Sequence, residues 1–410
     1  MTKRKAACAG IALTSILAFA VSAPGLSQAT GSSPPARYTM DAGTTSGFAG
    51  MSGGGGIGAA LGMMRGGGGQ VSHELTLRLG SHRAPSGPAT ADHFMPQGAG
   101  LGASVPLVSP ERTKGDTYEG GIPQGQMPRG RLLLFWGCGE HAPAGQPLVI
   151  DFAKMAKGQL PPNLFASGVR LPGDWQIMTS NSTTYGEWPN GRDRKVLTGK
   201  SSLLGAHKVV SSYAPEIAFT LADDFMLGLQ ARTAAQASGA VGLSWTGLPR
   251  ATGYYAWAMG AKGNGGNSAD MVWWSSSSTR MFGGELAGWL SPAAVSKLIS
   301  SGTVMPASQT ACTIPAEVKQ AGGEMLMTQL FAYGPQVDFS FPPRPRNARA
   351  GWQPDWITRV RFRSNTSLMA GMPQMSGRED TAGNTPDAPP AKPKCKGIKG
   401  IAMRAAGLCE

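Results

Sequence analysis

Short stretches in which apolar and polar residues alternate limit the fold of this chain more than any other feature. Between residues 71 and 79 the odd positions include Leu75, Leu77 and Leu79, whereas the even positions are polar. A period of two residues is typical of a strand with one buried face. The 59 glycines and 31 prolines indicate that many turns separate such strands. The sequence therefore predicts a mainly β protein, with one or more β-sandwich-like domains, a few short helices and disordered tails.

Residues 71–232 form the first predicted β-rich domain. Apolar runs of strand length recur in it, and the polar stretch from 81 to 130 between the first two of them is rich in glycine and proline. We expect that stretch to be a long loop. Besides residues 71–79, the predicted strands are residues 131–136, 148–152, 217–221 and 225–229, the last two forming a pair joined by a turn.

Residues 236–368 form the second predicted β domain. Alternation predicts one strand at 241–245 and another at 254–259, separated by a turn that contains proline. Ser291 followed by Pro292 is a typical helix start, and Gly302 a typical helix end, so a helix is expected as an insertion. Further predicted elements are strands at 271–274, 325–333 and 337–341 and a short helix at 315–321.

The order of motifs in this second domain resembles a known fold family. The pattern L-x-W, then P-x-A-x-x-Y, then a hairpin is similar to the early strands of fibronectin type III and immunoglobulin-like sandwiches, loosely over residues 236–345. The resemblance implies that Trp245 and Tyr254 pack inward between two sheets. It implies no activity, because this fold supports many functions. The whole chain also resembles secreted proteins of Gram-negative bacteria.

The N-terminus has the features of a secretory signal. Three basic residues precede an apolar stretch that is short for a membrane span, and small residues follow, so residues 1–29 are a predicted signal peptide cleaved after Ala29. An uncleaved anchor is the alternative. No later segment is apolar enough to predict a transmembrane helix in the mature chain. We therefore expect an exported protein, periplasmic or extracellular.

Three further segments have compositions that do not favour a packed core. Residues 30–70 are a glycine-rich leader that we expect to be disordered, since it has little apolar surface to bury. Residues 369–393 form a polar, proline-rich linker, also expected to be disordered. Residues 394–410 form a basic C-terminal segment flanked by cysteines.

Four cysteines remain after the predicted signal is removed: Cys138, Cys312, Cys395 and Cys409. An even number in an exported chain predicts two disulfides, with three possible connectivities. Pairing Cys138 with Cys312 and Cys395 with Cys409 is the simplest. If the segment after Cys395 were one straight helix, however, its ends would lie ~20 Å apart, too far for a disulfide. Four reduced thiols are the other alternative.

Arginines near the end of the second domain are the main candidate binding residues. Arg359, Arg361 and Arg363 alternate, so a strand projects them from one face at intervals of about 7 Å. Guanidinium groups suit bidentate contacts with phosphates or carboxylates, and an aromatic ring can stack beside them. A solvated sheet face, or an edge strand charged against aggregation, is the alternative. Arg344, Arg346 and Trp352 are nearby candidates in the same predicted site.

The formal net charge of +13 and a pair of tryptophans complete the binding hypothesis. Since Trp273 and Trp274 are consecutive, one faces outward if only one side of the strand is covered, and Trp274 is a candidate for stacking on a carbohydrate. A basic exported protein fits anionic glycans or lipid head groups, or an envelope protein, as partners, whereas nucleic acid is not expected.

No sequence motif predicts a reaction. The chain has neither HExxH nor a GxSxG elbow, and the ligand types at Cys138, Glu140 and His141 are too few and too crowded for a metal site. We therefore name no catalytic, metal-binding or cofactor-binding residue. The leading hypothesis is a non-catalytic exported protein that binds an envelope component or a protein partner. A hydrolase of envelope polysaccharide and a structural or assembly factor of the envelope are the alternatives.

Overall fold

The structure is a computed structural model of the chain. Strands make up 47% and helices 11% of what it describes, which confirms the predicted mainly β class. Everything described belongs to the first of two units, which divide after Pro373. The described residues are 34–47, 71–110, 130–155, 159, 176–193, 195–263, 269–282, 285–323, 325–345, 347 and 352–371.

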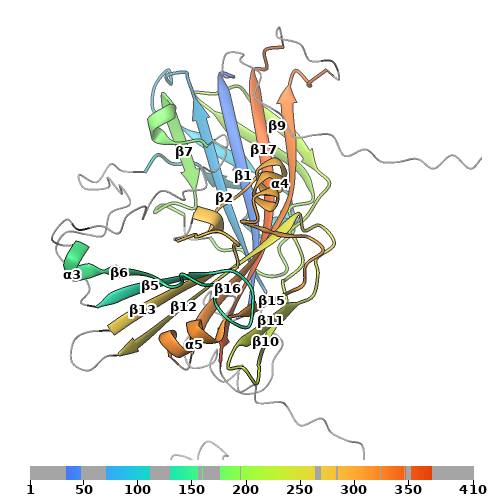
Figure 1. Cartoon of the computed structure of the whole chain (residues 1–410). Helices are drawn as coiled ribbons and strands as arrows, with labels where there is room; N and C mark the ends of the chain where they lie inside the picture. The colour runs from blue at the N-terminus through green and yellow to red at the C-terminus, as the bar shows by residue number, and fades with distance from the viewer. Residues whose placement is uncertain are drawn as a thin grey trace, which may run out of the picture. The chain divides into compact units, whose positions relative to one another are not determined.

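A ten-stranded mixed sheet forms the centre of this unit (Figure 1). Its strand order is β6-β5-β13-β12-β16-β17-β1-β2-β7, and β14 pairs with β12 beside this path. Neighbours are antiparallel except for two parallel pairs, β1 with β17 and β5 with β13. The strands are β1 (Ala36–Ser46), β2 (Ser72–Ser81), β5 (Arg131–Trp136), β6 (Leu148–Asp151), β7 (Thr184–Trp188), β12 (Gly253–Gly263), β13 (Ala269–Ser275), β14 (Met305–Pro306), β16 (Leu326–Phe341) and β17 (Trp356–Ala370).

Two smaller antiparallel sheets pack against the central sheet. The four-stranded one has the order β4-β3-β8-β9 and the three-stranded one the order β10-β11-β15. Their strands are β3 (Ala91–Phe94), β4 (Ser104–Pro106), β8 (Gly205–Ser211), β9 (Ile217–Leu221), β10 (Ala231–Ala235), β11 (Val241–Trp245) and β15 (Ala311–Ile314). The helices are α3 (Phe152–Met155), α4 (Pro292–Ser300), α5 (Ala316–Gly322) and the 3-10 turns η1 (Gln97–Ala99), η2 (Thr179–Asn181) and η3 (Glu285–Ala287).

Apolar side chains cover both faces of the central sheet around β12 and β13. One core cluster contains Trp274 and joins this sheet to both small sheets, while a second contains Trp273 and joins it to α4. The two tryptophans are therefore both buried, and the prediction that Trp274 lies on an exposed stacking face is wrong. Adjacent residues of a strand point to opposite faces of the sheet, so both tryptophans can be buried only if other elements pack on both faces.

Helix α4 begins as the sequence predicts. The Ser291 hydroxyl accepts a hydrogen bond from the backbone N–H of Ala294 at 3.2 Å, and Pro292 occupies the first turn. Gly302 follows the helix with φ +70°, a conformation that favours glycine. The apolar face of the helix, with Val295 and Leu298, lies in the second core cluster. None of the described helices is both long and apolar enough to span a membrane.

The predicted disordered leader contains a central strand, so that prediction is wrong for residues 36–46. β1 pairs with β2 on one side and with β17 on the other, and all but one of its residues are buried. Tyr38 and Met40 enter the core, although small residues and threonines make up most of the strand. Tertiary pairing outweighs composition here, because both edges of the strand find partners far away in sequence. Residues 30–33 and 48–70 lie outside the described residues.

The two predicted β regions contribute to the same sheets. β2, β5, β6 and β7 come from residues 71–232, and β12, β13, β16 and β17 from 236–368, yet all eight belong to the central sheet. The strands with the family resemblance also divide, since β11 joins the three-stranded sheet and β12 the central one. Trp245 and Tyr254 are buried with their rings 5.3 Å apart. The family resemblance itself stays a prediction.

Residues 225–229 are not the strand that the sequence predicts. Hydroxyl groups from the central sheet form hydrogen bonds with the backbone of this segment instead. Thr44 donates to the carbonyl of Met226 at 2.7 Å, and Ser46 donates to the carbonyl of Leu229 at 2.6 Å. Ser364 accepts from the N–H of Leu229 at 3.1 Å. A buried backbone needs hydrogen-bond partners, and side chains can supply them as well as a neighbouring strand.

The predicted signal peptide and the C-terminal segment, 1–29 and 394–410, lie outside the described residues. Of the predicted linker 369–393, only residues 369–371 are described, and β17 continues through Ala370.

Candidate functional site

The arginines of β17 lie on one face of the central sheet, but their charged groups contact other parts of the protein. Arg361 donates two hydrogen bonds to Asp41 of β1, at 2.7 and 2.9 Å, and a third to the carbonyl of Trp289 at 2.8 Å. Asp41 is fully buried and also pairs with Arg78 of β2 at 3.1 Å. Arg361 of β17 thus links β1 and the segment at Trp289 to its own strand.

Arg363 and Arg359 are engaged in the same way. Arg363 pairs with Glu74 at 2.6 Å, donates to the carbonyl of Ala287, and lies 4.2 Å from the ring centre of Trp289. Arg359 pairs with Asp338 at 3.2 Å and is buried. The geometry therefore gives no support to contacts between these arginines and an external anion.

Gly43 makes room for the pairing of Glu74 with Arg363. It lies directly between them in register, opposite Glu74 on β2 and Arg363 on β17. A Cβ atom at this position would lie 2.4 Å from Cγ of Glu74, a distance that packed atoms do not tolerate.

The remaining candidates of the predicted site are dispersed. Arg344 is exposed, with its guanidinium 5.5 Å from the ring centre of Trp352. Arg346 lies outside the described residues. Trp274 is buried on β13, separated from β17 by β12 and β16, and its indole N–H donates to the carbonyl of Gly137 at 2.8 Å. Arg344 and Trp352 contact each other, but the structure does not bring the described candidates and the arginines of β17 into one binding surface.

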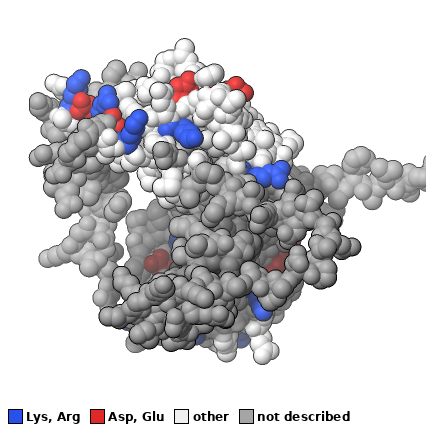
Figure 2. Space-filling model, turned by 90° about the horizontal axis from the view of Figure 1, so that it is seen from below, with Lys and Arg blue, Asp and Glu red and all other residues white. Residues whose placement is uncertain are grey.

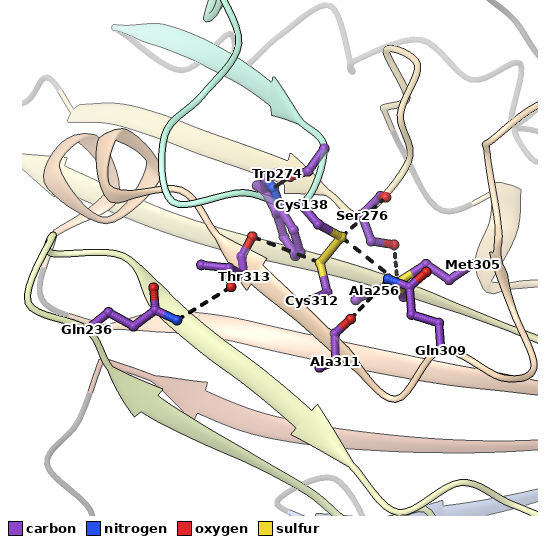
Figure 3. Close-up of a disulfide and its surroundings, with 11 residues drawn as sticks. Cys138, Gln236, Ala256, Trp274, Ser276, Met305, Gln309, Ala311, Cys312 and Thr313 are labelled. Carbon is purple, nitrogen blue, oxygen red and sulfur yellow. Dashed lines mark hydrogen bonds between the residues drawn. A yellow bond between two sulfur atoms is a disulfide. The ribbon is translucent and has the colours of Figure 1, made fainter.

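A disulfide joins the central sheet to the three-stranded sheet (Figure 3). Cys138, just after β5, is bonded to Cys312 on β15, which is the pairing that the sequence favours. Cys395 and Cys409 lie outside the described residues. The nearby His141 pairs with Glu317 of α5 at 3.0 Å on the surface. Within the described ranges no three His, Cys, Asp or Glu residues gather in a way that could hold a metal ion.

Sequence analysis missed a buried chain of hydrogen bonds that links β1 to the four-stranded sheet. The Tyr38 hydroxyl bonds Nδ1 of His93, and Nε2 of His93 bonds Nδ1 of His207 at 2.9 Å. Nε2 of His207 lies 2.7 Å from the carbonyl oxygen of Leu203. Neither the tyrosine nor either histidine is exposed by more than 2%. The signal was available as His93 and His207, but nothing in the sequence shows that they meet.

The carbonyl group at one end of this series of hydrogen bonds determines which nitrogen or oxygen atom carries each proton. A carbonyl oxygen only accepts, so Nε2 of His207 must carry a hydrogen, and in neutral rings this makes His93 the next donor and Tyr38 the last. Burial lowers the pKa of His93 well below its usual value, and the neighbouring His207 lowers it further. Burial likewise lowers the pKa of His207, while the bond to Leu203 opposes the shift. Both imidazoles are therefore neutral, which suits a structural role.

The outer edge of β9 is one of the strand edges that end a sheet in the described part of the chain. This strand ends the four-stranded sheet, and β8 is its one partner among the described strands. On its other side, none of its backbone groups has a hydrogen-bond partner among the described residues. Unpaired strand edges are templates for the addition of a further strand.

Two hollows meet at Ala218, in the middle of β9. The first has a volume of about 470 Å³ and lies along the sheet toward β3, with Phe94, Met95 and Lys208 among its lining residues. The second, of about 300 Å³, extends to the junction of β16 and β17. Ala218 and Thr220 are exposed. The residues that line the second hollow are Pro215, Glu216, Ala218, Phe341, Asp355 and Trp356.

The described surface does not carry its charge as one basic area on the side shown in Figure 2. Lys and Arg side chains lie there among Asp and Glu side chains. A continuous basic surface would attract polyanions at long range, whereas mixed charges favour local, directional contacts. On this side, the described charges favour local contacts over long-range attraction of a polyanion.

Comparison of the chain with protein families, with curated proteins and with solved structures gave no match in any of the three.

Proposed function

We propose that this protein is exported and binds an extended segment of a partner protein along the open edge of β9, without catalysing a reaction. The observation that carries the proposal is the unpaired edge of β9, where two hollows meet at Ala218. Strand addition obtains affinity from backbone hydrogen bonds and specificity from pockets that receive alternate side chains. An envelope protein that crosses or lines the export compartment fits as the partner.

The edge can be tested with a neutral peptide that favours a strand. The mature chain, residues 30–410, is titrated into fluorescein-labelled Ser-Val-Thr-Leu-Thr-Val-Ser, and binding is followed by fluorescence anisotropy. This peptide reads the same in both directions, so parallel and antiparallel pairing both present Val, Leu and Val on one side. Saturable binding is expected.

Two surface variants show where the peptide binds. Ala218→Arg places a long charged side chain between the two hollows and should weaken binding at least tenfold. Val196→Arg changes a loop residue that is 72% exposed and should leave binding unchanged. Circular dichroism checks that both variants stay folded. The proposal is overturned if no saturable binding occurs at millimolar protein, or if Ala218→Arg binds as well as the unchanged chain.

The same assay examines the other ligands that the sequence indicates. Anionic glycans and vesicles containing anionic lipid are added in a salt series. Binding that weakens with salt but persists in Ala218→Arg would replace the edge proposal with polyanion recognition, since exposed charge contacts are screened by salt.

A polysaccharide hydrolase remains the second candidate, because Glu216 and Asp355 both line the second hollow. Glycosidases use two carboxylates, one of which is a general acid that depends on a buried setting. Both carboxylates here are exposed, and this favours binding over catalysis.

Export has its own test. When the full-length gene is expressed in a Gram-negative host, the mature chain in the periplasmic or culture fraction should begin at Thr30, as measured by mass spectrometry of the N-terminal peptide. A chain that keeps residues 1–29 and sediments with membranes would show the uncleaved anchor instead.

A further inference from the structure

The second hollow differs from the first in the sign of its charge. Glu216 and Asp355 line the second hollow, and no Lys or Arg is among its described lining residues. Lys208 lines the first hollow, with its ammonium 5.5 Å from the ring centre of Phe94. A local acidic site stands out in a chain whose net charge is +13.

These carboxylates have little to neutralise them within the described residues. The Asp355 carboxylate has no ion pair or hydrogen bond there, although its backbone N–H bonds the carbonyl of Phe341 at 2.7 Å. Glu216 pairs only with Lys208, at 4.0 Å, and both side chains are well exposed. An exposed ion pair at this distance contributes little, so Glu216 is free to contact another cation.

Two aromatic residues, Phe341 and Trp356, also line the second hollow. Phe341 is 55% exposed, and its ring stacks on that of the buried Trp356 with 6.5 Å between centres. The face of an aromatic ring attracts a cation by about 0.5–1 kcal/mol at an exposed site. A hollow with two carboxylates and an exposed aromatic face therefore fits an ammonium or guanidinium group.

We infer that the segment bound along β9 carries a Lys or Arg side chain that enters the second hollow, with an apolar side chain on the same face entering the first. This inference rests on the proposed function and names the chemistry of the partner. Alternate residues of an added strand project to one side at intervals of about 7 Å, so a single strand can supply both groups. The ammonium of Lys208 disfavours a second cation in the first hollow, which sets the order of the two groups along the strand.

A second copy of this chain does not fit as the occupant through its own β9. The strand reads Ile-Ala-Phe-Thr-Leu and has no basic residue to offer. Antiparallel pairing of two β9 strands would also bring Glu216 of each copy toward the residues after Leu221 of the other, where Asp223 and Asp224 follow. Like charges opposite each other destabilise strand pairs.

The test compares two charged peptides, Ser-Val-Thr-Lys-Thr-Val-Ser and Ser-Val-Thr-Glu-Thr-Val-Ser, under the conditions used for the neutral peptide. At 50 mM salt the Lys peptide should bind at least tenfold more tightly than the Glu peptide. The double variant Glu216→Gln/Asp355→Asn should reduce that preference to less than threefold. Asp92→Asn, which removes a carboxylate from β3 in the same sheet, is the matched control and should keep the full preference.

The results separate the two proposals. Equal binding of the Lys and Glu peptides, still blocked by Ala218→Arg, would overturn the cation inference and leave strand addition at β9 standing. A preference for Lys that the double variant does not reduce would also overturn it, since the cation would then bind elsewhere. If neither these peptides nor the neutral one binds, both the proposed function and this inference are wrong.

Discussion

Strands β17 and β9 differ in what they leave for a partner. β17 pairs along both edges, with β16 and β1, and its arginines contact Asp41, Glu74 and Asp338. Among the described strands β9 pairs along one edge, with β8, and its exposed side chains are a small alanine and a threonine. The strand with conspicuous charges is thus an interior structural element, while the plain strand offers unpaired backbone groups and two hollows.

A row of charged residues in the sequence indicates the chemistry of a strand but not whether its side chains are accessible. The partner of Arg361, Asp41, lies 320 residues earlier in the chain. Since the ion pair forms between β1 and β17 inside the sheet, it fixes their register and occupies the guanidinium.

The Asp41→Ala change should destabilise the protein most. It leaves Arg361 buried without its carboxylate and also removes the partner of Arg78, and breaking a buried ion pair in this way costs about 3–5 kcal/mol. The free energy of unfolding is measured by urea denaturation. Asp223→Ala is the control, because its pair with Arg250 is partly exposed and contributes about 1 kcal/mol or less. Equal effects of the two changes would show that the arginines of β17 are not structural.

Tyr38→Phe should have the next largest effect, about 1–3 kcal/mol, because it leaves the buried Nδ1 of His93 without a donor. Tyr213→Phe is a matched control. The Tyr213 hydroxyl is buried and has no hydrogen-bond partner among the residues that the structure describes, so its removal should be close to neutral. The comparison shows whether the hydrogen-bond chain attaches the four-stranded sheet, and with it β9, to the central sheet. A loss from Tyr213→Phe as large as that from Tyr38→Phe would contradict this role.

Acid should weaken the same attachment. Burial lowers the pKa values of His93 and His207 in the folded protein, so below about pH 6.5 the unfolded chain binds more protons than the folded one. The free energy of unfolding should therefore decrease between pH 7 and pH 5. In His93→Gln/His207→Gln this slope should become shallower, with a remainder from His73, whose pKa burial also lowers. An unchanged slope in the double variant would exclude the two histidines as its source.

Arg344→Ala should have the smallest effect. Its contact with Trp352 is exposed and contributes about 0.5–1 kcal/mol at most. Thermal unfolding of this variant should match that of the unchanged chain within about 2 °C. A loss comparable to that of Asp41→Ala would mean that the end of β16 is held by contacts of Arg344 that resemble those of β17.

Local patterns predicted much of the fold. Alternation at 71–79 and 241–245 corresponds to β2 and β11, and the Ser-Pro pair at 291–292 begins α4. These predictions are confirmed because the alternation of a strand and the capping of a helix depend on residues close together in the sequence. The strand at 36–46 could not be recognised in this way, because its small residues become favourable only between β2 and β17.

The candidate site shows the same limit more strongly. Sequence placed Arg359, Arg361 and Arg363 on one face of a strand, which is correct, but only the pairing of β1 with β17 decides that the face is internal. Nothing about residues 217–221 marks them as a site. Their edge is open because β8 is their sole neighbour in the sheet, a property of strand order rather than of side chains.

The mainly β class and the alternating faces of the clearest strands follow from the sequence alone. Each depends on residue type and short spacing. The folded structure is needed to show which charges are buried, that Cys138 pairs with Cys312, that His93 meets His207, and which strand ends a sheet. These outcomes depend on contacts between segments tens to hundreds of residues apart, and their free energies arise only when the segments meet.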